Sequence, residues 1–189
     1  LPAPMQSNII TVIPVYNGER FIQKTLESVA AQTVKPDRLI VLDNCSTDST
    51  PKIVQEFTGL KCEYLRNPSN LGLFGNMNRA LEFAEQTRHL HILCADDLIT
   101  PKFFEKLVPA LESCSGFGLA FCLDERIDET GEYLSISGRV TGQVEEVPKA
   151  AYLAHKGEIA NQALGGTIYK TNFQKAPCQF RMDMPILAD

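Results

Sequence analysis

The sequence has few positive charges and no concentrated basic stretch. Its 18 Lys and Arg residues are outnumbered by 23 Asp and Glu residues, which gives a formal net charge of −5. Because binding to nucleic-acid phosphates needs a concentrated basic surface, we expect no nucleic-acid partner. No apolar run approaches the roughly 18 residues of a membrane span. The first residues, LPAPMQSN, lack the charged and apolar regions of a signal peptide.

Several sequence signatures of enzymes are also missing. Neither G-x-G-x-x-G nor G-x-x-x-x-G-K-[ST] follows the first strand-like segment, which argues against dinucleotide oxidoreductases and P-loop enzymes. The absence of G-x-S-x-G argues against a serine hydrolase. None of the six cysteines forms a C-x-x-C pair, and the three histidines show no ligand spacing. We therefore expect reduced, buried thiols and a cytoplasmic location, with neither disulfides nor a zinc site.

What is present is an alternation of apolar strands with amphipathic helices. At 189 residues the chain suits one domain. The alternation predicts an α/β fold with a mainly parallel sheet, and strands that are apolar throughout predict helices on both of its faces. We expect strands at 9–15, 38–43, 62–66, 89–95 and 118–123, and helices at 20–32, 51–57, 74–87 and 101–113, the last capped by Thr100. Beyond residue 124 the pattern weakens, and we expect a hairpin or mobile loop in 124–150, the start of a helix at 151–156 and a strand at 165–170.

Polar or aromatic side chains follow each of the first four strands, where packing does not require them. The carboxyl ends of parallel strands form the edge of the sheet where ligands bind. This edge is expected to carry an aromatic ring, amides, a guanidinium group and carboxylates. They belong to Tyr16 and Asn17, Asp43 and Asn44, Arg66 and Asn67, and Asp96 and Asp97.

Each of these groups also has a simpler explanation. Adjacent Asp96 and Asp97 suit a divalent cation such as Mg²⁺ or Mn²⁺ that neutralises a diphosphate, but they also suit a turn before the next helix. Tyr16 can stack on a nucleobase, yet Asn17 with the glycine after it suits a tight turn. Asp43 or Asn44 can bond a base edge or a ribose hydroxyl, or form an Asx turn.

Four segments in order and spacing resemble glycosyltransferase family 2. They are 11-TVIPVYNGERFIQKTLESVAAQT-33, 39-LIVLDNCSTDST-50, 66-RNPSNLGLFGNMNRAL-81 and 93-LCADDLITP-101. The resemblance implies an inverting nucleotide-sugar transferase of GT-A fold, with a mainly parallel sheet between helices. It implies a single domain, 1–189, with a Rossmann-like nucleotide-sugar-binding half at 8–112 and a smaller acceptor-side half at 113–189.

The resemblance also implies the site residues. Donor-binding positions are Pro14, Tyr16, Asn17, Glu19, Asp43, Asn44, Arg66, Asn70, Gly72, Asn78 and Asp96. Asp97 resembles the direct ligand of Mn²⁺ or Mg²⁺, with Asp96 beside it. The family often carries an acid at the position of Cys94, so this chain has a minimal Asp-Asp version of the motif. Inverting transfer needs a general base for the acceptor hydroxyl, and Asp189 resembles it, with Asp183 as the reserve candidate.

The resemblance implies a UDP-sugar donor and an acceptor that is a saccharide, a lipid-linked sugar or a protein. The product would belong to polysaccharide, lipopolysaccharide or glycoprotein synthesis. Members of the family usually continue past this length, so we expect a catalytic core cut short, whose missing segment would hold acceptor contacts and any peripheral attachment to the inner face of the membrane. Two alternatives stay open: a catalytically silent nucleotide-sugar-binding or scaffold module, and a sugar-1-phosphate nucleotidyltransferase, which the missing glycine-rich loop disfavours.

Overall fold

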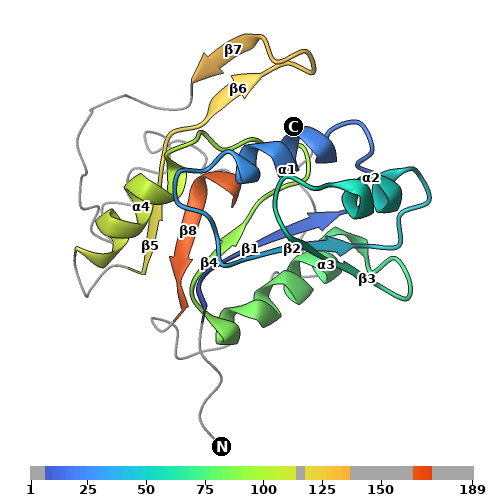
Figure 1. Ribbon diagram of the computed structural model, residues 1–189, viewed down its shortest axis with the longest axis horizontal. Coiled ribbons are helices and arrows are strands. Elements are labelled where there is room, and N and C mark those ends of the chain that lie inside the picture. The colour runs from blue at the N-terminus through green and yellow to red at the C-terminus, as the bar shows by residue number, and fades with distance from the viewer. Residues whose placement is uncertain (1–6, 114–117, 137–163, 172–189) are drawn as a thin grey trace, which may run out of the picture.

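The computed structural model describes residues 7–113, 118–136 and 164–171, which form strands, helices and short 3-10 helices in alternation (Figure 1). In chain order the elements are β1 (Ser7–Val15), α1 (Ile22–Ala30), β2 (Arg38–Asp43), α2 (Thr50–Glu56), β3 (Cys62–Arg66), α3 (Gly72–Leu81), the 3-10 helix η1 (Glu82–Gln86), β4 (Thr87–Ile92), α4 (Phe103–Glu112), β5 (Leu119–Phe121), β6 (Glu125–Ile127), β7 (Tyr133–Ile136), the 3-10 helix η2 (Leu164–Gly166) and β8 (Thr167–Lys170).

Six of the strands form one sheet in the order β3-β2-β1-β4-β8-β5. β1 pairs in parallel with β2 and β4, and β2 pairs in parallel with β3, whereas β8 runs antiparallel to both β4 and β5. The predicted mainly parallel sheet is therefore confirmed. The strand order reverses at β1, because β2 and β3 lie on one side of it and β4 on the other. Ligands of open α/β sheets bind at such a reversal, outside the carboxyl ends of the strands.

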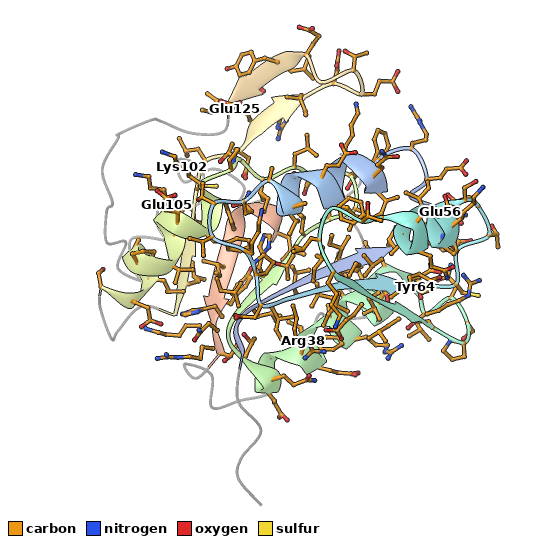
Figure 2. The ribbon with its side chains drawn as sticks, in the orientation of Figure 1. Arg38, Glu56, Tyr64, Lys102, Glu105 and Glu125 are labelled. Atoms are coloured by element: carbon orange, nitrogen blue, oxygen red, sulfur yellow. The ribbon has the colours of Figure 1, made fainter. Side chains whose placement is uncertain are left out.

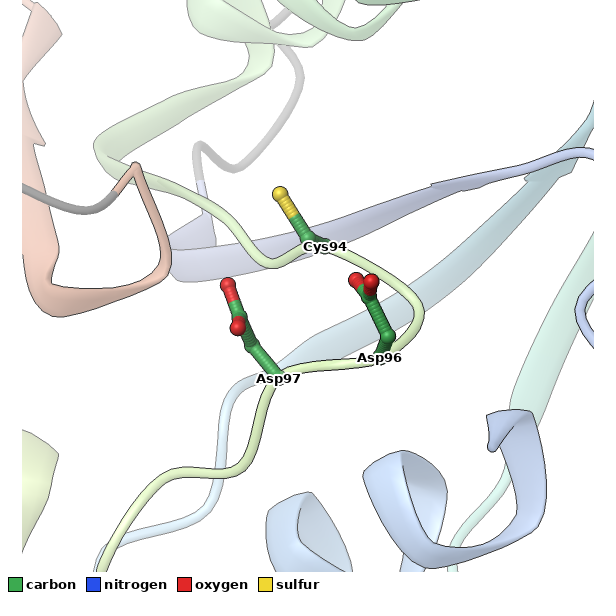
Figure 3. Close-up of side chains that lie close together, drawn as sticks. All are labelled: Cys94, Asp96 and Asp97. Carbon is green, nitrogen blue, oxygen red and sulfur yellow. The ribbon is translucent and has the colours of Figure 1, made fainter. Parts of the chain in front are cut away.

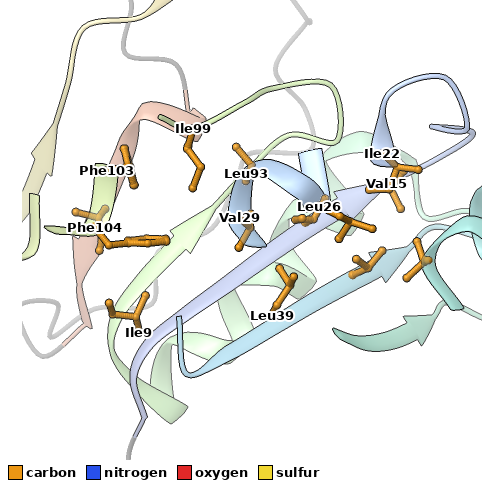
Figure 4. Packing of buried hydrophobic residues seen from close by; sticks show 14 of the residues in the cluster. Ile9, Val15, Ile22, Leu26, Val29, Leu39, Leu93, Ile99, Phe103 and Phe104 are labelled. Carbon is orange, nitrogen blue, oxygen red and sulfur yellow. The ribbon is translucent and has the colours of Figure 1, made fainter. Parts of the chain in front are cut away.

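Side chains alternate between the two faces of the sheet, and both faces are buried. On β1, Ile9 and Ile13 join a cluster with residues of α1, α2 and α4 (Figure 4), while Ile10 and Val12 join a second cluster with residues of α3. Each fully buried aliphatic side chain stabilises the fold by roughly 1.5–3 kcal/mol relative to its exposed state. Helices on both faces, as the apolar strands predicted, thus hold the central strands in place.

An ion pair fixes the amino end of the β2–β3 pair. Arg38, labelled in Figure 2, donates from Nε and Nη2 to the two carboxylate oxygens of Glu63 at 2.7 and 2.8 Å. The hydrogen bond to Glu63 raises the pKa of Arg38. A two-pronged contact of this kind has a fixed geometry, so it favours one register of β3 against β2.

The predicted bounds of the third helix and the fourth strand are wrong. The helix was expected to continue to Thr87, but α3 ends at Leu81 and η1 follows it. η1 keeps Phe83 buried against the sheet and brings Thr87 into β4 opposite Ser7. β4 was expected to reach residue 95, but it ends at Ile92, and the next residue makes the last bond to β1, from the Leu93 amide to the Val12 carbonyl at 3.0 Å.

The predicted cap of the fourth helix is also wrong. α4 begins at Phe103 with Lys102 as its N-terminal flanking residue, and no side chain caps it. The Thr100 carbonyl instead accepts bonds from the Phe103 amide at 3.0 Å and from Gln32 Nε2 at 2.7 Å. Thr100 therefore contributes through its backbone, joining the end of α1 to the start of α4.

The other predicted helices and strands agree with the structure to different degrees. α1 and α2 are shorter or shifted by one or two residues at each end, β2 and β3 have the predicted bounds, and β5 is shorter than 118–123. A hairpin in 124–150 is confirmed by β6 and β7, and β8 confirms the strand near 165–170. The helix start at 151–156 lies outside the described residues. In the described ranges, no helix has both the length and the apolar character to cross a membrane.

Candidate functional site

The carboxyl ends of β1, β2 and β3 form one row through Val15, Asp43 and Arg66, which are register partners. Asp43 is fully buried. Its Oδ2 accepts from the Tyr64 hydroxyl at 2.5 Å and from Arg66 Nη1 at 2.6 Å, and its Oδ1 accepts from the Ser46 amide at 2.9 Å. Tyr64 is labelled in Figure 2. Asp43 thus joins β3 to the loop after β2, and Arg66 is held in place at the edge of the sheet.

Asn44 organises the loop between β3 and α3. Its Nδ2 donates to Asn70 Oδ1 at 2.8 Å and to the Gly72 carbonyl at 3.1 Å. Its Oδ1 accepts from Asn67 Nδ2 and from the Leu71 amide, both at 2.9 Å. Four bonds to one buried amide leave its hydrogen-bonding capacity used within the protein. Asn44 therefore shapes the walls of the site.

The asparagine network continues under α3. Asn67 Nδ2 also donates to Asn76 Oδ1 at 2.9 Å, and Asn76 Nδ2 donates to the Leu42 carbonyl at 3.0 Å. Arg79 donates to Asn67 Oδ1. Because each buried amide here has partners, the network fixes the start of α3 against β2.

The loop after β1 is joined to the loop after β2. The Asn17 amide donates to Ser46 Oγ at 2.9 Å, and Asn17 Oδ1 accepts from the Thr47 amide at 2.8 Å. Glu19 accepts from the Ser49 amide at 2.9 Å through Oε2. Asn17 has φ of 53°, a left-handed conformation that asparagine tolerates better than most residues. Asn17 and Glu19 thus set the position of Tyr16, a residue that is 50% exposed.

A pocket of about 240 Å³ opens between the ends of β1 and β2 and the start of α3. Its lining residues are Pro14, Val15, Tyr16, Asn44, Asn70, Gly72, Leu73, Asn76 and Met77. Exposed Tyr16 lines it together with aliphatic side chains and three of the ordered amides. An aromatic ring beside apolar surface and a few fixed polar groups suits a flat heterocycle such as a nucleobase.

On the other side of β1, the turn after β4 gathers a thiol and two carboxylates. Possible ligand atoms of Cys94, Asp96 and Asp97 all lie within 4.8 Å of one another (Figure 3). Burial, the charge of Asp96 and that of Asp124 raise the pKa of Asp97 to about 6. Burial and the charges of Asp97 and Asp96 raise the pKa of the Cys94 thiol to about 12. A cation between like charges that are held close together relieves their repulsion, so this cluster suits one.

The 3-10 helix η2 packs against the carboxylates of Asp97 and Asp124. A Cβ atom on Gly165 would lie 3.1 Å from Asp97 Oδ2, and one on Gly166 would lie 2.4 Å from Asp124 Oδ1. The Gly165 carbonyl accepts from His91 Nε2 at 2.9 Å, and burial lowers the pKa of His91 to about 4. Neutral His91 therefore holds a side-chain-free segment beside Asp97, which leaves space around the carboxylates.

The donor set fits a divalent cation. Asp96 and Asp97 supply the oxygen ligands that Mg²⁺ and Mn²⁺ prefer. The raised pKa of Asp97 is what an acid shows when it is buried beside other carboxylates, and a cation bound there would favour its charged form. The glycines beside it leave room that a side chain would fill. These residues are therefore suited to hold a metal ion at the same edge of the sheet as the pocket.

The structure brings most of the predicted site residues to this edge. Pro14, Tyr16, Asn44, Asn70 and Gly72 line the pocket. Asn17, Glu19, Asp43 and Arg66 join the surrounding loops, while Asp96 and Asp97 lie in the turn after β4. Asn78 lies half-buried on α3. The proposed bases Asp189 and Asp183 lie outside the described residues.

Sequence reasoning missed several residues of the site. The pocket is lined from α3 by Leu73, Asn76 and Met77. Beside the carboxylates of the turn after β4 lie Gly165, Gly166 and Asp124. The available signal was the polar Asn76 beside the apolar Met77 in a predicted helix. An amide at a position that faces the core is seldom buried unless other polar groups bond it. Nothing in the sequence indicated that β8 would insert beside β4.

Comparisons with known proteins agree with this geometry. The profile described as Glycosyl transferase family 2 matches residues 10–162. An uncharacterized glycosyltransferase of Methanocaldococcus jannaschii is 28% identical over 151 residues, which is 78% of this chain and 52% of the relative. The UDP-Glc:alpha-D-GlcNAc-diphosphoundecaprenol beta-1,3-glucosyltransferase of Escherichia coli is 34% identical over 95 residues, 50% of this chain and 37% of the relative. The chain thus spans about half the length of these relatives, or less.

Two solved structures share the fold. S. aureus TarS 1–349 in complex with UDP-GlcNAc has a TM-score of 0.57 and 22% identity, with 87% of this chain and 45% of that chain covered. A mannosyltransferase from Pyrobaculum calidifontis in complex with GDP-Man and Mn²⁺ has a TM-score of 0.55 and 24% identity, with 67% and 38% covered. With its mostly parallel sheet, its GT-A structural neighbours and a family match over most of its length, the chain belongs to glycosyl transferase family 2.

Proposed function

We propose that this protein is a metal-assisted, inverting glycosyltransferase that moves a sugar from a UDP-sugar to a hydroxyl group of a saccharide, lipid-linked or protein acceptor. The observation that carries the proposal is the placement of two features beside the carboxyl end of β1. The pocket walled by Tyr16 lies on one side, and the turn with Asp96 and Asp97 lies on the other. A nucleoside diphosphate has a heterocycle at one end and charged phosphates at the other, which matches this arrangement.

Each feature has a role in the proposed reaction. Tyr16 and the aliphatic side chains of the pocket bind the nucleoside part of the donor, and Asn44, bonded to Asn70, holds the pocket wall in place. Asp96 and Asp97 would hold a divalent cation such as Mn²⁺. When bound, the cation stabilises the negative charge of the departing diphosphate. Asp189 is proposed to accept the proton of the attacking hydroxyl, with Asp183 as the alternative.

The choice of donor is supported by the relatives. The E. coli glucosyltransferase is named for UDP-Glc and a lipid-linked acceptor, and the TarS structure contains UDP-GlcNAc. The P. calidifontis structure contains GDP-Man, so both uridine and guanosine donors belong in the test. Its Mn²⁺ supports a divalent cation for the cluster around Asp97.

The proposal is tested with a panel of UDP- and GDP-sugars. We expect release of UDP from at least one UDP-sugar in the presence of Mn²⁺, and an inverted anomeric configuration of the product in proton NMR spectra. Turnover should fall strongly in Asp189→Asn and be unaffected by Glu27→Ala, which removes an exposed carboxylate of α1. Donor binding without turnover of any donor would favour the silent module, and unchanged turnover in Asp189→Asn would remove that residue as the base.

A further inference from the structure

Cys94 lies at the candidate metal site, and the proposed reaction assigns no role to it. Its sulfur and one carboxylate oxygen each of Asp96 and Asp97 lie within 4.8 Å of one another. Figure 3 shows the three side chains projecting from one turn toward the same side. A thiol is a soft ligand for metals and carboxylates are hard ones, so the cluster has a mixed donor set.

The backbone holds the three groups together before any ion binds. The Asp97 amide donates to the Cys94 carbonyl at 3.1 Å, which closes the turn. Thr25 Oγ1 donates to the Ala95 carbonyl at 2.8 Å and fixes the middle of the turn to α1. A Cβ atom on Gly165 would lie 3.1 Å from Asp97 Oδ2, so η2 approaches this carboxylate closely. The thiol and the carboxylates therefore meet in a turn that α1 and η2 support.

The spacing suits a single ion. Zinc binds thiolate sulfur at about 2.3 Å and carboxylate oxygen at about 2.0–2.2 Å, so in a tetrahedral site the ligand atoms lie roughly 3.5 Å apart. The ligand atoms of the cluster lie within 4.8 Å of one another, so side-chain movements of about 1 Å bring them onto one ion. Cys94 also contacts the edge of the apolar cluster under α3, which offers a simpler role as a small packing residue.

We propose that the Cys94 sulfur is a third protein ligand of the cation and that it makes this site bind thiophilic divalent ions, such as Zn²⁺ and Cd²⁺, in preference to Mg²⁺. The inference rests on the proposed function, because it concerns the same metal site. On binding, a metal–sulfur bond forms and the thiol proton passes to solvent, with no change of oxidation state. A packing role predicts no such preference, because Cys94 would then make no bond to the ion.

The test is a titration of the reduced protein with Cd²⁺, read by the ultraviolet charge-transfer absorption of a cadmium–thiolate bond. We expect the absorption to saturate with one ion per chain in the wild type. It should also do so in Cys122→Ser, a control that removes the thiol of the residue after β5. In Cys94→Ser and in Cys94→Ala the absorption should be lost. In competition against Mn²⁺, the Zn²⁺ affinity of these two variants should be at least about tenfold lower than that of the wild type. A tenfold loss is the lower end of what removing a residue that only contacts a metal ligand costs.

The two proposals fail in different ways. An absorption that persists in Cys94→Ser, or that never forms in the wild type, overturns the role of Cys94. Binding of Mn²⁺, followed by electron paramagnetic resonance, tests the metal of the proposed function separately. Mn²⁺ binding retained in Cys94→Ser and lost in Asp97→Ala is the result we expect. Absence of Mn²⁺ binding in the wild type would contradict the proposed metal-assisted reaction.

Discussion

Asp97 illustrates, at the scale of single residues, how a binding group weakens the fold that carries it. Burial and the charges of Asp96 and Asp124 raise the pKa of Asp97 to about 6. The folded protein therefore holds a proton on this acid more tightly than the unfolded chain does. Stability from this group is present below pH 3.8 and is lost as the pH rises through about 6. At neutral pH an ionised Asp97 without a cation opposes folding.

The first prediction follows from this sign. Asp97→Asn should raise the free energy of unfolding of the metal-free protein at pH 7.5 by about 1–3 kcal/mol, because a shift of one pKa unit corresponds to about 1.4 kcal/mol and the group is partly exposed. The same change should abolish Mn²⁺ binding. Urea denaturation with EDTA and Mn²⁺ titration measure the two effects.

The pH dependence provides the control for this prediction. The stability difference between Asp97→Asn and the wild type should disappear as the pH falls from about 6 to 3.8, the range between the folded and the ordinary pKa of Asp97. Mn²⁺ affinity of the wild type should fall over the same range, because the cation competes with a proton. A variant less stable than the wild type at pH 7.5 would contradict this account of Asp97.

Asp43 provides the second prediction, in which a substitution lowers the free energy of unfolding. Asp43→Asn keeps the shape of the side chain but removes the charge that accepts from Tyr64 and Arg66. We expect a loss of about 1–3 kcal/mol in urea denaturation, since hydrogen bonds to a charged group contribute about 1.5–3 kcal/mol each and Arg66 is partly exposed. The matched control is Glu129→Gln, which breaks the exposed pair with Arg20, 67% exposed on both sides, and should change stability by less than about 1 kcal/mol.

At the scale of elements, the start of α3 links the fold to the pocket. Gly72 has φ of 72°, a conformation that costs residues with a side chain about 1–2 kcal/mol. Its amide donates to Asn70 Oδ1 at 2.8 Å and its carbonyl accepts from Asn44 at 3.1 Å. The first residue of the helix is therefore fixed by the same amides that line the pocket.

The third prediction uses a second glycine as its reference. Gly72→Ala should cost about 1–2 kcal/mol of stability and weaken UDP binding several-fold, because the pocket wall shifts with the backbone. Gly131 has φ of 96° in the turn between β6 and β7 and is not among the residues that line the pocket. Gly131→Ala should cost a similar amount of stability and leave UDP affinity unchanged. Equal UDP affinity in both variants would show that the pocket does not depend on the start of α3.

The elements also show which parts of the fold the sequence could predict. β2 and β3 have the expected bounds because each strand-like segment ends where a turn-forming segment begins. β4 ends earlier than its apolar run, because Leu93 packs into the core after the last bond to β1. η1 and the uncapped start of α4 depend on tertiary contacts. Local patterns carry no record of such contacts.

Some residues of the candidate site could likewise be predicted from the sequence, and others could not. Asp43, Arg66 and the Asp96–Asp97 pair were predicted because their strands had to end at one edge of a parallel sheet. The pocket side chains of α3 and the approach of Gly165 to Asp97 depend on how α3 and β8 pack. Those placements are set by contacts between segments far apart in the chain, so they required the structure.

At the scale of the whole molecule, the reversal of strand order at β1 explains why the two halves of the site lie near each other. β2 and α3 bring the pocket to one side of β1, and β4 brings Asp96 and Asp97 to the other. Residues about 80 positions apart therefore meet at one edge of the sheet. The division into a donor half at 8–112 and an acceptor half at 113–189 remains a proposal, because most of the second half lies outside the described residues.

The central claim is that one nucleoside diphosphate spans the pocket and the metal site. Calorimetric titration of UDP, with Mn²⁺ and with EDTA, tests it most directly in the wild type, in Asp97→Ala and in Glu27→Ala, which removes an exposed carboxylate of α1. We predict binding in the wild type and in Glu27→Ala that requires Mn²⁺, and loss of this binding in Asp97→Ala. UDP binding that is absent in both conditions, or that is equally strong with EDTA and in Asp97→Ala, would contradict the claim.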